Sequence, residues 1–257
     1  MNGIFDPPER QERNERRDIA RENDKRPLPK RFYSAVDYAA DGDQFLIRLD
    51  GKPVRTPAKN RLAVTSEAVA ATLVAEWAAQ KDVIEPSTMP VTRLVNSAID
   101  GVVSNFAAVK AEIVRYAGSD LLCYRADKPE RLVRWQDELW SPPIAWMRER
   151  FDARFLLAEG VIHVEQFPET LEAVDAAIGE PDALRLAALN TITVLTGSAI
   201  LALAVAYGRL SAEEAWTAAH VDEDFEIELW GEDAEATARR DARWREMQAA
   251  ALVLAAG

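Results

Sequence analysis

Eight carboxylate side chains crowd one stretch of the sequence, HVDEDFEIELWGEDAEATARR at residues 220–240, around the pair Trp230–Gly231. In a helix, Asp222 and Glu223 would each share a face with Glu226, at spacings of four and three residues. Two carboxylates with separated pKa values can hydrolyse glycosidic bonds, so a carboxylate-based hydrolase of unknown substrate is one interpretation. Such pairs usually come from different elements, and eight acids in one helical segment are redundant for that chemistry. We therefore expect these acids to be solvated or to face a partner.

Apolar residues are interleaved with the acids. Val221, Phe225 and Leu229 form one stripe of the predicted helix, while Ile227 and Trp230 lie on a different side. The pattern favours a core position for Trp230. The alternative is a large aromatic side chain at the rim of a surface that recognises a basic or apolar partner.

Other chemistries find little support in the sequence. Neither GxxxxGK[ST] nor GxGxxG occurs, and Ser198 follows Gly197 without a GxSxG motif. His163 and Glu165 form an HxE pair, but a zinc deaminase needs two further cysteines and Cys123 is the only one in the chain. We therefore predict no catalytic residue, no metal and no cofactor.

The composition is that of a globular protein, with 257 residues, 48% hydrophobic and 29% charged. A formal net charge of -12 argues against nucleic acid as a partner. A single cysteine is typical of a reducing compartment. Residues 1–29 mix acids with arginines and contain no apolar stretch, so we expect a disordered charged arm and a bacterial cytoplasmic location.

One segment raises the possibility of a membrane. Residues 186–207 carry no charge over a length that could span a bilayer, so a membrane-linked adaptor is a further alternative. Asn190 and several hydroxyl side chains dilute the segment, and Gly197 interrupts it. Two consecutive helices buried in a protein core explain the segment better, and we predict no membrane span.

The elements that position these residues form an α+β protein. Residues 31–64 are predicted to form strands separated by turns at Asp41–Gly42 and Asp50–Gly51, with Phe45, Ile47 and Leu49 alternating in a half-buried strand. From Ser66, the expected N-cap, apolar residues recur every four positions at Val69, Leu73 and Trp77, which indicates a helix. The predicted division is an arm over 1–29, a small β-rich domain over 30–90 that ends in this helix, and an α-helical domain over 91–257.

Within the helical domain we predict helices over 92–102, 109–117 and 127–140. Asp127 would cap the third of these, and Pro142–Pro143 would break it. A small β excursion is expected around Gly160 in residues 154–166, and Ser211 with Glu214 has the pattern of a capping box.

Taken in order, several of these stretches resemble one family. LDGKPVRTP, AEWAAQ, MPVTRL, SDLLCYRA and the Trp-Gly pair together look like the alpha-subunit assembly chaperones of the F-type ATP synthase, the ATP-twelve family, over residues 29–253. The resemblance implies a small β-rich part followed by a helical part and no catalysis. It also implies a partner, the unassembled alpha subunit, which is later handed over to the beta subunit. Relatives in eukaryotes would work in the mitochondrial matrix, and nothing in the sequence demands more than a monomer.

The resemblance also singles out residues. The functionally important acid before the Trp-Gly pair corresponds to Asp222 or Glu223, and Trp77 of AEWAAQ is a sensitive position that is structural or partner-binding. Glu226 departs from the family, which more often has Gln there. We hypothesise that Asp222 and Glu223 bind the alpha subunit while Phe225 and Trp230 hold the helix in place. The predicted partner-binding residues are Asp222, Glu223, Glu226 and Trp230, with Trp77 and Phe225 structural or partner-binding.

Overall fold

The computed structural model describes residues 27–160 and 164–256, so most of the predicted arm and His163 of the HxE pair lie outside the described residues. The chain divides into a small unit, residues 27–32 with 80–85, and a large unit, residues 33–79 with 86–256. In the small unit two extended stretches pair: Arg31 N donates to Asp82 O at 2.9 Å, and Ile84 N donates to Pro29 O at 2.8 Å. The predicted domain boundaries near residues 30 and 90 stay predictions.

The large unit begins with an antiparallel sheet of β1 (Val36–Asp41), β2 (Gln44–Leu49), β3 (Lys52–Pro53) and β4 (Ala63–Val64). β2 is central, because β1 pairs on one side while β3 and β4 pair on the other. Both predicted turns are confirmed, and Gly42 and Gly51 have φ values of 68° and 75° that favour glycine. The predicted alternation in β2 is incomplete, because Leu46 is buried as well as Ile47 and Leu49. Neighbouring side chains of a strand point to opposite faces, so both faces of the sheet are covered at this point.

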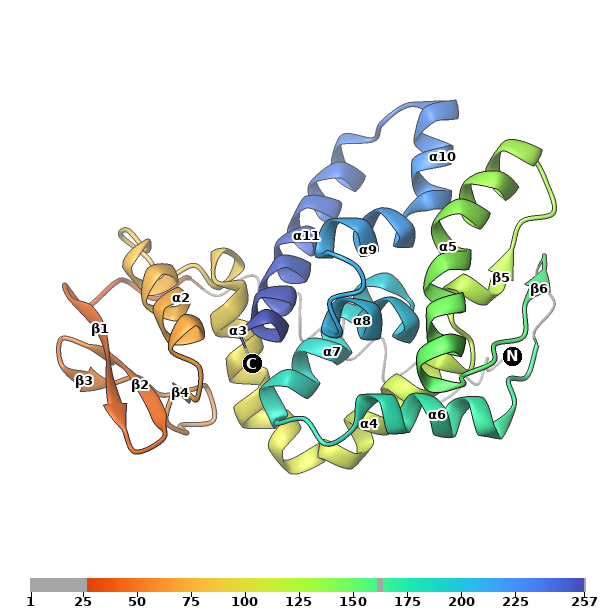
Figure 1. Ribbon diagram of the computed structural model, residues 1–257. Helices are drawn as coiled ribbons and strands as arrows, with labels where there is room; N and C mark the ends of the chain where they lie inside the picture. The colour runs from red at the N-terminus through yellow and green to blue at the C-terminus, as the bar shows by residue number, and fades with distance from the viewer. Residues whose placement is uncertain (1–26, 161–163, 257) are drawn as a thin grey trace, which may run out of the picture. The chain divides into compact units, whose positions relative to one another are not determined.

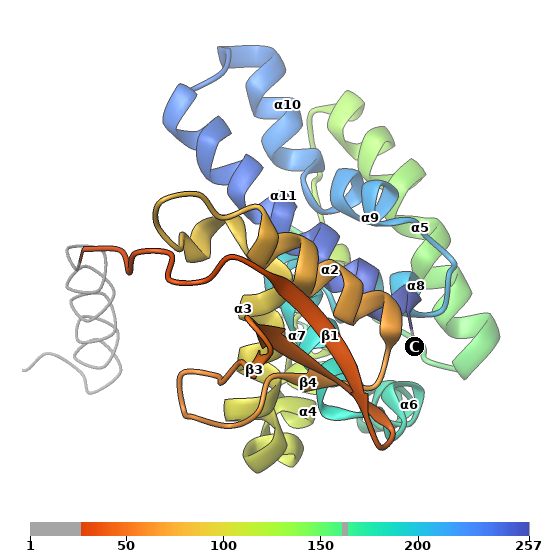
Figure 2. The ribbon, with the colours of Figure 1, turned by 90° about the vertical axis from the view of Figure 1, so that its left-hand side faces the viewer.

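Helix α2 (Glu67–Ala78) packs against the sheet through buried Val69 and Leu73, as the four-residue spacing predicts (Figure 2). Ser66 does precede the helix in an extended conformation, but its side chain makes no capping hydrogen bond. Near the other end of α2, the Glu76 side chain connects this helix to the next one. Its carboxylate accepts hydrogen bonds from Val91 N and Thr92 N at 2.7 Å each. These bonds satisfy amide groups that a helix leaves free at its N-terminus.

The next segment is one nearly continuous helical run. After η1 (Pro86–Thr88), α3 (Pro90–Ser97) passes through a π-helical turn, η2 (Ala98–Val102), into α4 (Val103–Ala117). The two helices predicted over 92–102 and 109–117 are therefore joined, and the run ends before Gly118 as predicted. The π turn absorbs the interruption at Gly101, and Asn105 with φ -125° marks a kink just after it.

Helix α5 (Glu130–Phe151) corrects two predictions. It follows η3 (Leu121–Cys123) and β5 (Tyr124–Arg125), and it begins at Glu130 after Pro129, so Asp127 does not cap it. Pro142 and Pro143 lie inside the helix and do not break it. Packing on both sides outweighs the lost hydrogen bonds, since Trp140 and Met147 are fully buried and Trp140 Nε1 donates to Ala218 O at 2.6 Å.

The predicted β excursion is confirmed as β6 (Ala158–Glu159), which pairs in parallel with β5 and turns at Gly160. α6 (Pro168–Ile178) leads to α7 (Ala183–Thr196) and α8 (Ala199–Ala206), the two consecutive buried helices that the uncharged segment predicts. Gly197 separates them with φ 68°, and the Ser198 hydroxyl caps α8 by accepting from Leu201 N at 3.0 Å. Among residues 27–160 and 164–256, no helix combines the length and the apolar character needed to cross a membrane.

Three helices complete the chain: α9 (Ala212–Ala219), α10 (Val221–Trp230) and α11 (Ala234–Ala255). The capping box of Ser211 and Glu214 at the start of α9 is confirmed. α11 packs along α7 and also contacts α3, α8 and α9, while α10 packs on α5 (Figure 1). A small sheet followed by a larger helical part confirms the α+β prediction.

Candidate functional site

The acid-rich helix α10 combines buried and exposed side chains. It starts after His220, and its buried residues are Val221 and Phe225. The guanidinium of Arg131 on α5 lies 5.8 Å from the centre of the Phe225 ring, so the ring is enclosed by α5. Phe225 is therefore a core residue, whereas Leu229, the third member of the predicted stripe, is 55% exposed.

Two acids of α10 hold it in place. Asp224 forms an ion pair with Arg240 of α11, and Glu228 forms one with Arg131 of α5. The hydrogen bond from Arg240 to Asp224 raises the pKa of Arg240, and both partners in that pair are partly shielded from solvent. Spacing within one helix gave no sign of these two roles, because Arg131 lies 97 residues away in the sequence and Arg240, 16 residues from Asp224, belongs to another helix.

Three acids, Asp222, Glu223 and Glu226, point to solvent, and we refer to them as the acid face. Asp222 nevertheless accepts a hydrogen bond of 2.7 Å from Nε2 of the buried Gln136 on α5. Glu223 is 58% exposed, with its carboxylate 3.9 Å from His220 Nε2. The Glu226 side chain makes no hydrogen bond or ion pair among the described residues. The first-turn acids also interact favourably with the positive end of the helix dipole.

Trp230 is 85% exposed, so the core position favoured by the sequence pattern is wrong. The helix ends one residue later at Gly231, whose φ of 87° and ψ of 172° suit glycine, and the chain then turns toward α11. Leu229 and Trp230, neighbours in the last turn of α10, are therefore both exposed to solvent. An exposed Trp beside an exposed Leu is typical of a protein-binding site.

A groove of about 260 Å³ runs between α10 and the first half of α5. Arg131, Arg134 and Trp135 of α5 line it, together with two carboxylates, Glu138 and Glu228. Arg131 is paired with Glu228 and Arg134 with Glu130, so the groove presents balanced charges and the Trp135 ring near the acid face. The surface around α10 thus combines both charges with large aromatic side chains.

Trp77 is in α2, a different helix from α10. Its ring packs edge-on against Tyr33, with the ring centres 5.7 Å apart, and Tyr33 Oη donates to Trp77 O at 2.7 Å. The indole Nε1 is buried and has no hydrogen-bond partner among the described residues. These contacts favour the structural alternative for Trp77, although its role stays a prediction.

Buried carboxylates elsewhere serve the fold. Asp120 is fully buried and accepts from Leu122 N and Ile200 N at 3.1 Å each, which ties η3 to the start of α8. Burial raises its pKa to about 6. Burial also raises the pKa of Glu76, which the amides and hydroxyl at the start of α3 partly offset. Among the described residues, no three His, Cys, Asp or Glu side chains cluster as metal ligands.

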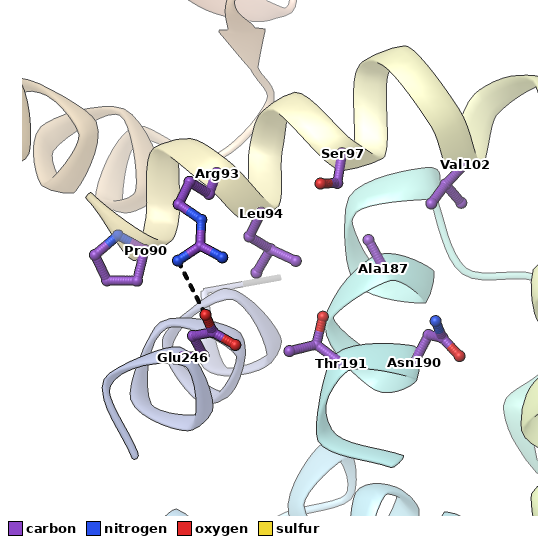
Figure 3. Close-up of a pocket in the computed structure, with 9 residues that line it drawn as sticks. All are labelled: Pro90, Arg93, Leu94, Ser97, Val102, Ala187, Asn190, Thr191 and Glu246. Atoms are coloured by element: carbon purple, nitrogen blue, oxygen red, sulfur yellow. Dashed lines mark ion pairs between the residues drawn. The ribbon is translucent and has the colours of Figure 1, made fainter. Parts of the chain in front are cut away.

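A separate pocket of about 280 Å³ lies between α3, α7 and α11 (Figure 3). Arg93 of α3 reaches Glu246 of α11 across it in an ion pair of 2.9 Å, while Ser97 and Thr191 line it from α3 and α7. None of the predicted site residues lines this pocket, so it is distinct from the acid face.

Comparison with known proteins extends over nearly the whole described chain. The model of the family ATP12 chaperone protein matches residues 30–148. The solved structure of Atu1473 from Agrobacterium tumefaciens is similar with a TM-score of 0.86 and 50% identity, covering 92% of this chain and 89% of that one.

Atp12 from Paracoccus denitrificans is similar with a TM-score of 0.82 and 40% identity, covering 88% of this chain and 97% of that one. A mutant form of the same protein matches with a TM-score of 0.82 and 39% identity. The sequence identity of 40–50% over most of both chains, together with the match to the family model, shows that these proteins are homologous. The chain belongs to the ATP12 chaperone family.

Proposed function

We propose that this chaperone binds the unassembled alpha subunit of the F-type ATP synthase and hands it over to the beta subunit. It would act in the bacterial cytoplasm as a monomer that forms a one-to-one complex. Membership of the ATP12 chaperone family supports the chaperone role. The observation that carries the choice of binding surface is the exposed end of α10, where the acid face adjoins Leu229 and Trp230.

The mechanism follows from mass action. A subunit of a hetero-oligomer exposes apolar surface before it meets its neighbours, and this surface promotes aggregation. A partner that covers the surface lowers the concentration of the aggregating species in proportion to its own affinity and concentration. The affinity must be moderate, because the beta subunit has to displace the chaperone. No bond is made or broken, so the acids act by charge and shape alone.

The two kinds of side chain on α10 would have different tasks. Trp230 and Leu229 supply apolar area that becomes buried on binding, and a buried aromatic often dominates the energy of an interface. The acid face would steer a basic surface of the alpha subunit and fix its orientation, which affects the association rate and the specificity more than the affinity. Asp222 has a second task in the chaperone itself, since it accepts a hydrogen bond from Gln136.

The test is co-expression of the chaperone with the alpha subunit from the same organism, followed by measurement of soluble, co-purified alpha subunit. The double variant Asp222→Asn, Glu223→Gln removes two charges but keeps an oxygen acceptor for Gln136. The stronger variant Asp222→Lys, Glu223→Lys reverses both charges. Its matched control is Asp43→Lys, Glu172→Lys, which makes the same change in charge at two exposed acids outside α10.

We expect wild type and control to keep the alpha subunit soluble and to release it when the beta subunit is added. The charge-reversed α10 variant should lose capture while retaining its circular dichroism spectrum. Equal capture by the charge-reversed variant and wild type would remove the acid face from the binding site. If wild type itself neither co-purifies with the alpha subunit nor keeps it soluble, the proposed client is wrong.

A further inference from the structure

A second groove, larger than the one beside α10, lies on the other half of α5. Its volume is about 860 Å³, in the range of sites that enclose a ligand or a few peptide residues. Side chains from the last three turns of α5 form one wall, and residues 153–157 with Phe167 form the other. We call it the arginine groove, because Arg125, Arg148 and Arg154 line it. None of the predicted site residues does.

Arg125 places an incompletely neutralised cation in the wall. Its side chain is only 12% exposed, and its guanidinium donates to the carbonyls of Leu122 at 3.0 Å and Gln136 at 3.2 Å. The nearest carboxylate, Asp137, is 3.9 Å away and largely solvated. Burial accordingly lowers the pKa of Arg125, and an anion in the groove would be attracted more strongly than at an open surface.

The remaining charges leave the groove positive. Arg154 is paired with Asp152 at 2.9 Å, so these two charges cancel. Arg148 is exposed and makes no side-chain hydrogen bond or ion pair among the described residues. Among the lining residues Glu149 is then the one carboxylate left against Arg125 and Arg148, so the lining sums to one positive unit in a chain whose formal charge is -12. Asp137, which lies 3.9 Å from Arg125, is outside the lining and reduces this charge from the solvent side.

Apolar side chains make up much of the rest of the lining. Leu157 and Phe167 are each 52% exposed, which is high for large apolar residues, and Ile144 adds apolar surface from α5. Covering these side chains removes apolar area from water and favours binding. The groove therefore offers both an apolar surface and arginines, which pair well with carboxylates.

We propose that the arginine groove binds an extended segment of the client polypeptide in which acidic and apolar side chains lie close together. The carboxylate would pair with Arg148 and be attracted by Arg125, while the neighbouring apolar side chains would cover Leu157 and Phe167. The charge preference is opposite to that of the acid face on α10. The chaperone would thus recognise two different features of one client. The identity of the client rests on the proposed function, whereas the peptide chemistry of the groove does not.

A fluorescence anisotropy titration tests the chemistry without the alpha subunit. The probe is a short fluorescein-labelled peptide of leucine, serine and glutamate, and the comparison peptide has lysine in place of glutamate. We expect the acidic peptide to bind more tightly and to lose affinity with added salt. Arg148→Glu should weaken its binding at least about tenfold, the effect of losing one charge-assisted contact. The control Arg115→Glu, at an exposed arginine of α4, should leave binding unchanged.

Photo-crosslinking tests the same groove with the proposed client. Benzoylphenylalanine at position 157 should crosslink to an acidic, apolar stretch of the alpha subunit, whereas the same residue at position 103, also an exposed apolar site, should not. If neither peptide depends on Arg148 and position 157 gives no crosslink while the alpha subunit is still captured, the groove proposal fails and the proposed function stands. If the acidic peptide binds through Arg148 but the alpha subunit is not captured, the groove proposal holds and the client is wrong.

Discussion

The buried carboxylate of Asp120 should make the chaperone more stable at mildly acidic pH. Burial raises the pKa of Asp120 from 3.8 to about 6 in the folded state. The folded protein therefore binds a proton more readily than the unfolded chain, and the stability from this group is greatest below the unfolded pKa and lost as pH rises through the folded one. The full effect is roughly 3 kcal/mol, of which about 1.4 kcal/mol should appear between about pH 7.5 and about pH 5.

The perturbation that isolates this effect is Asp120→Asn. Asn has one oxygen where the carboxylate has two, so either Leu122 N or Ile200 N loses its acceptor. The variant should be less stable at neutral pH by about 1–3 kcal/mol, the cost of one unsatisfied buried group. It should also lack the gain of about 1.4 kcal/mol on acidification, because its side chain does not titrate.

Urea unfolding, followed by tryptophan fluorescence and circular dichroism at both pH values, measures the two effects. Other groups also respond to pH, so the informative quantity is the difference between wild type and variant. Asp43→Asn changes an exposed loop residue in the same way and should follow wild type. If Asp120→Asn gains as much unfolding free energy on acidification as wild type, Asp120 does not have a raised pKa and the reasoning fails.

Three further predictions concern α10 and its support. Trp230→Ala should change the unfolding free energy by less than about 0.5 kcal/mol, because the side chain is in solvent, yet it should reduce capture of the alpha subunit in the co-expression assay. Gly231→Ala should cost about 1–3 kcal/mol in urea unfolding, since its backbone conformation is nearly restricted to glycine; an unchanged midpoint would show that the turn relaxes freely. Gln136→Leu should cost about 1–3 kcal/mol, because Ala126 N loses its acceptor and Asp222 its donor, and equal stability would mean that water replaces both bonds.

Periodicity and turn chemistry predict most of the elements. The glycine turns, the α2 stripe, the division of the uncharged segment at Gly197 and the capping box all depend on residues close together in sequence, and all are confirmed. The prediction for Pro142 and Pro143 was wrong for a different reason: the packing that sustains α5 involves Trp140 and a carbonyl of α9, far along the chain. Rules that depend on neighbouring residues in the sequence do not predict contacts between helices so far apart in the chain.

In the candidate site, too, the contacts between different helices could not be predicted from the sequence. The acids of α10 are evident from the sequence, but their division into anchoring and outward groups is not. Asp224 and Glu228 are held by arginines of two other helices, and those pairings exist only after folding. The position of Trp230 could not be predicted either. A helical stripe identifies apolar residues, but it does not show whether a neighbouring element covers them, and Trp230 is exposed. The arginine groove left no recognisable motif, since its walls come from separate segments.

The buried helices α7 and α8 have a consequence for synthesis of the chaperone. Their apolar sequence, which is uncharged from residue 186 to 207, is shielded in part by α11, which packs along α7 and is made after α10. Until residues 234–255 have left the ribosome, α7 therefore remains partly uncovered, and the nascent chain is itself prone to aggregate. The chaperone therefore completes the burial of its own apolar helices only after its translation is almost finished.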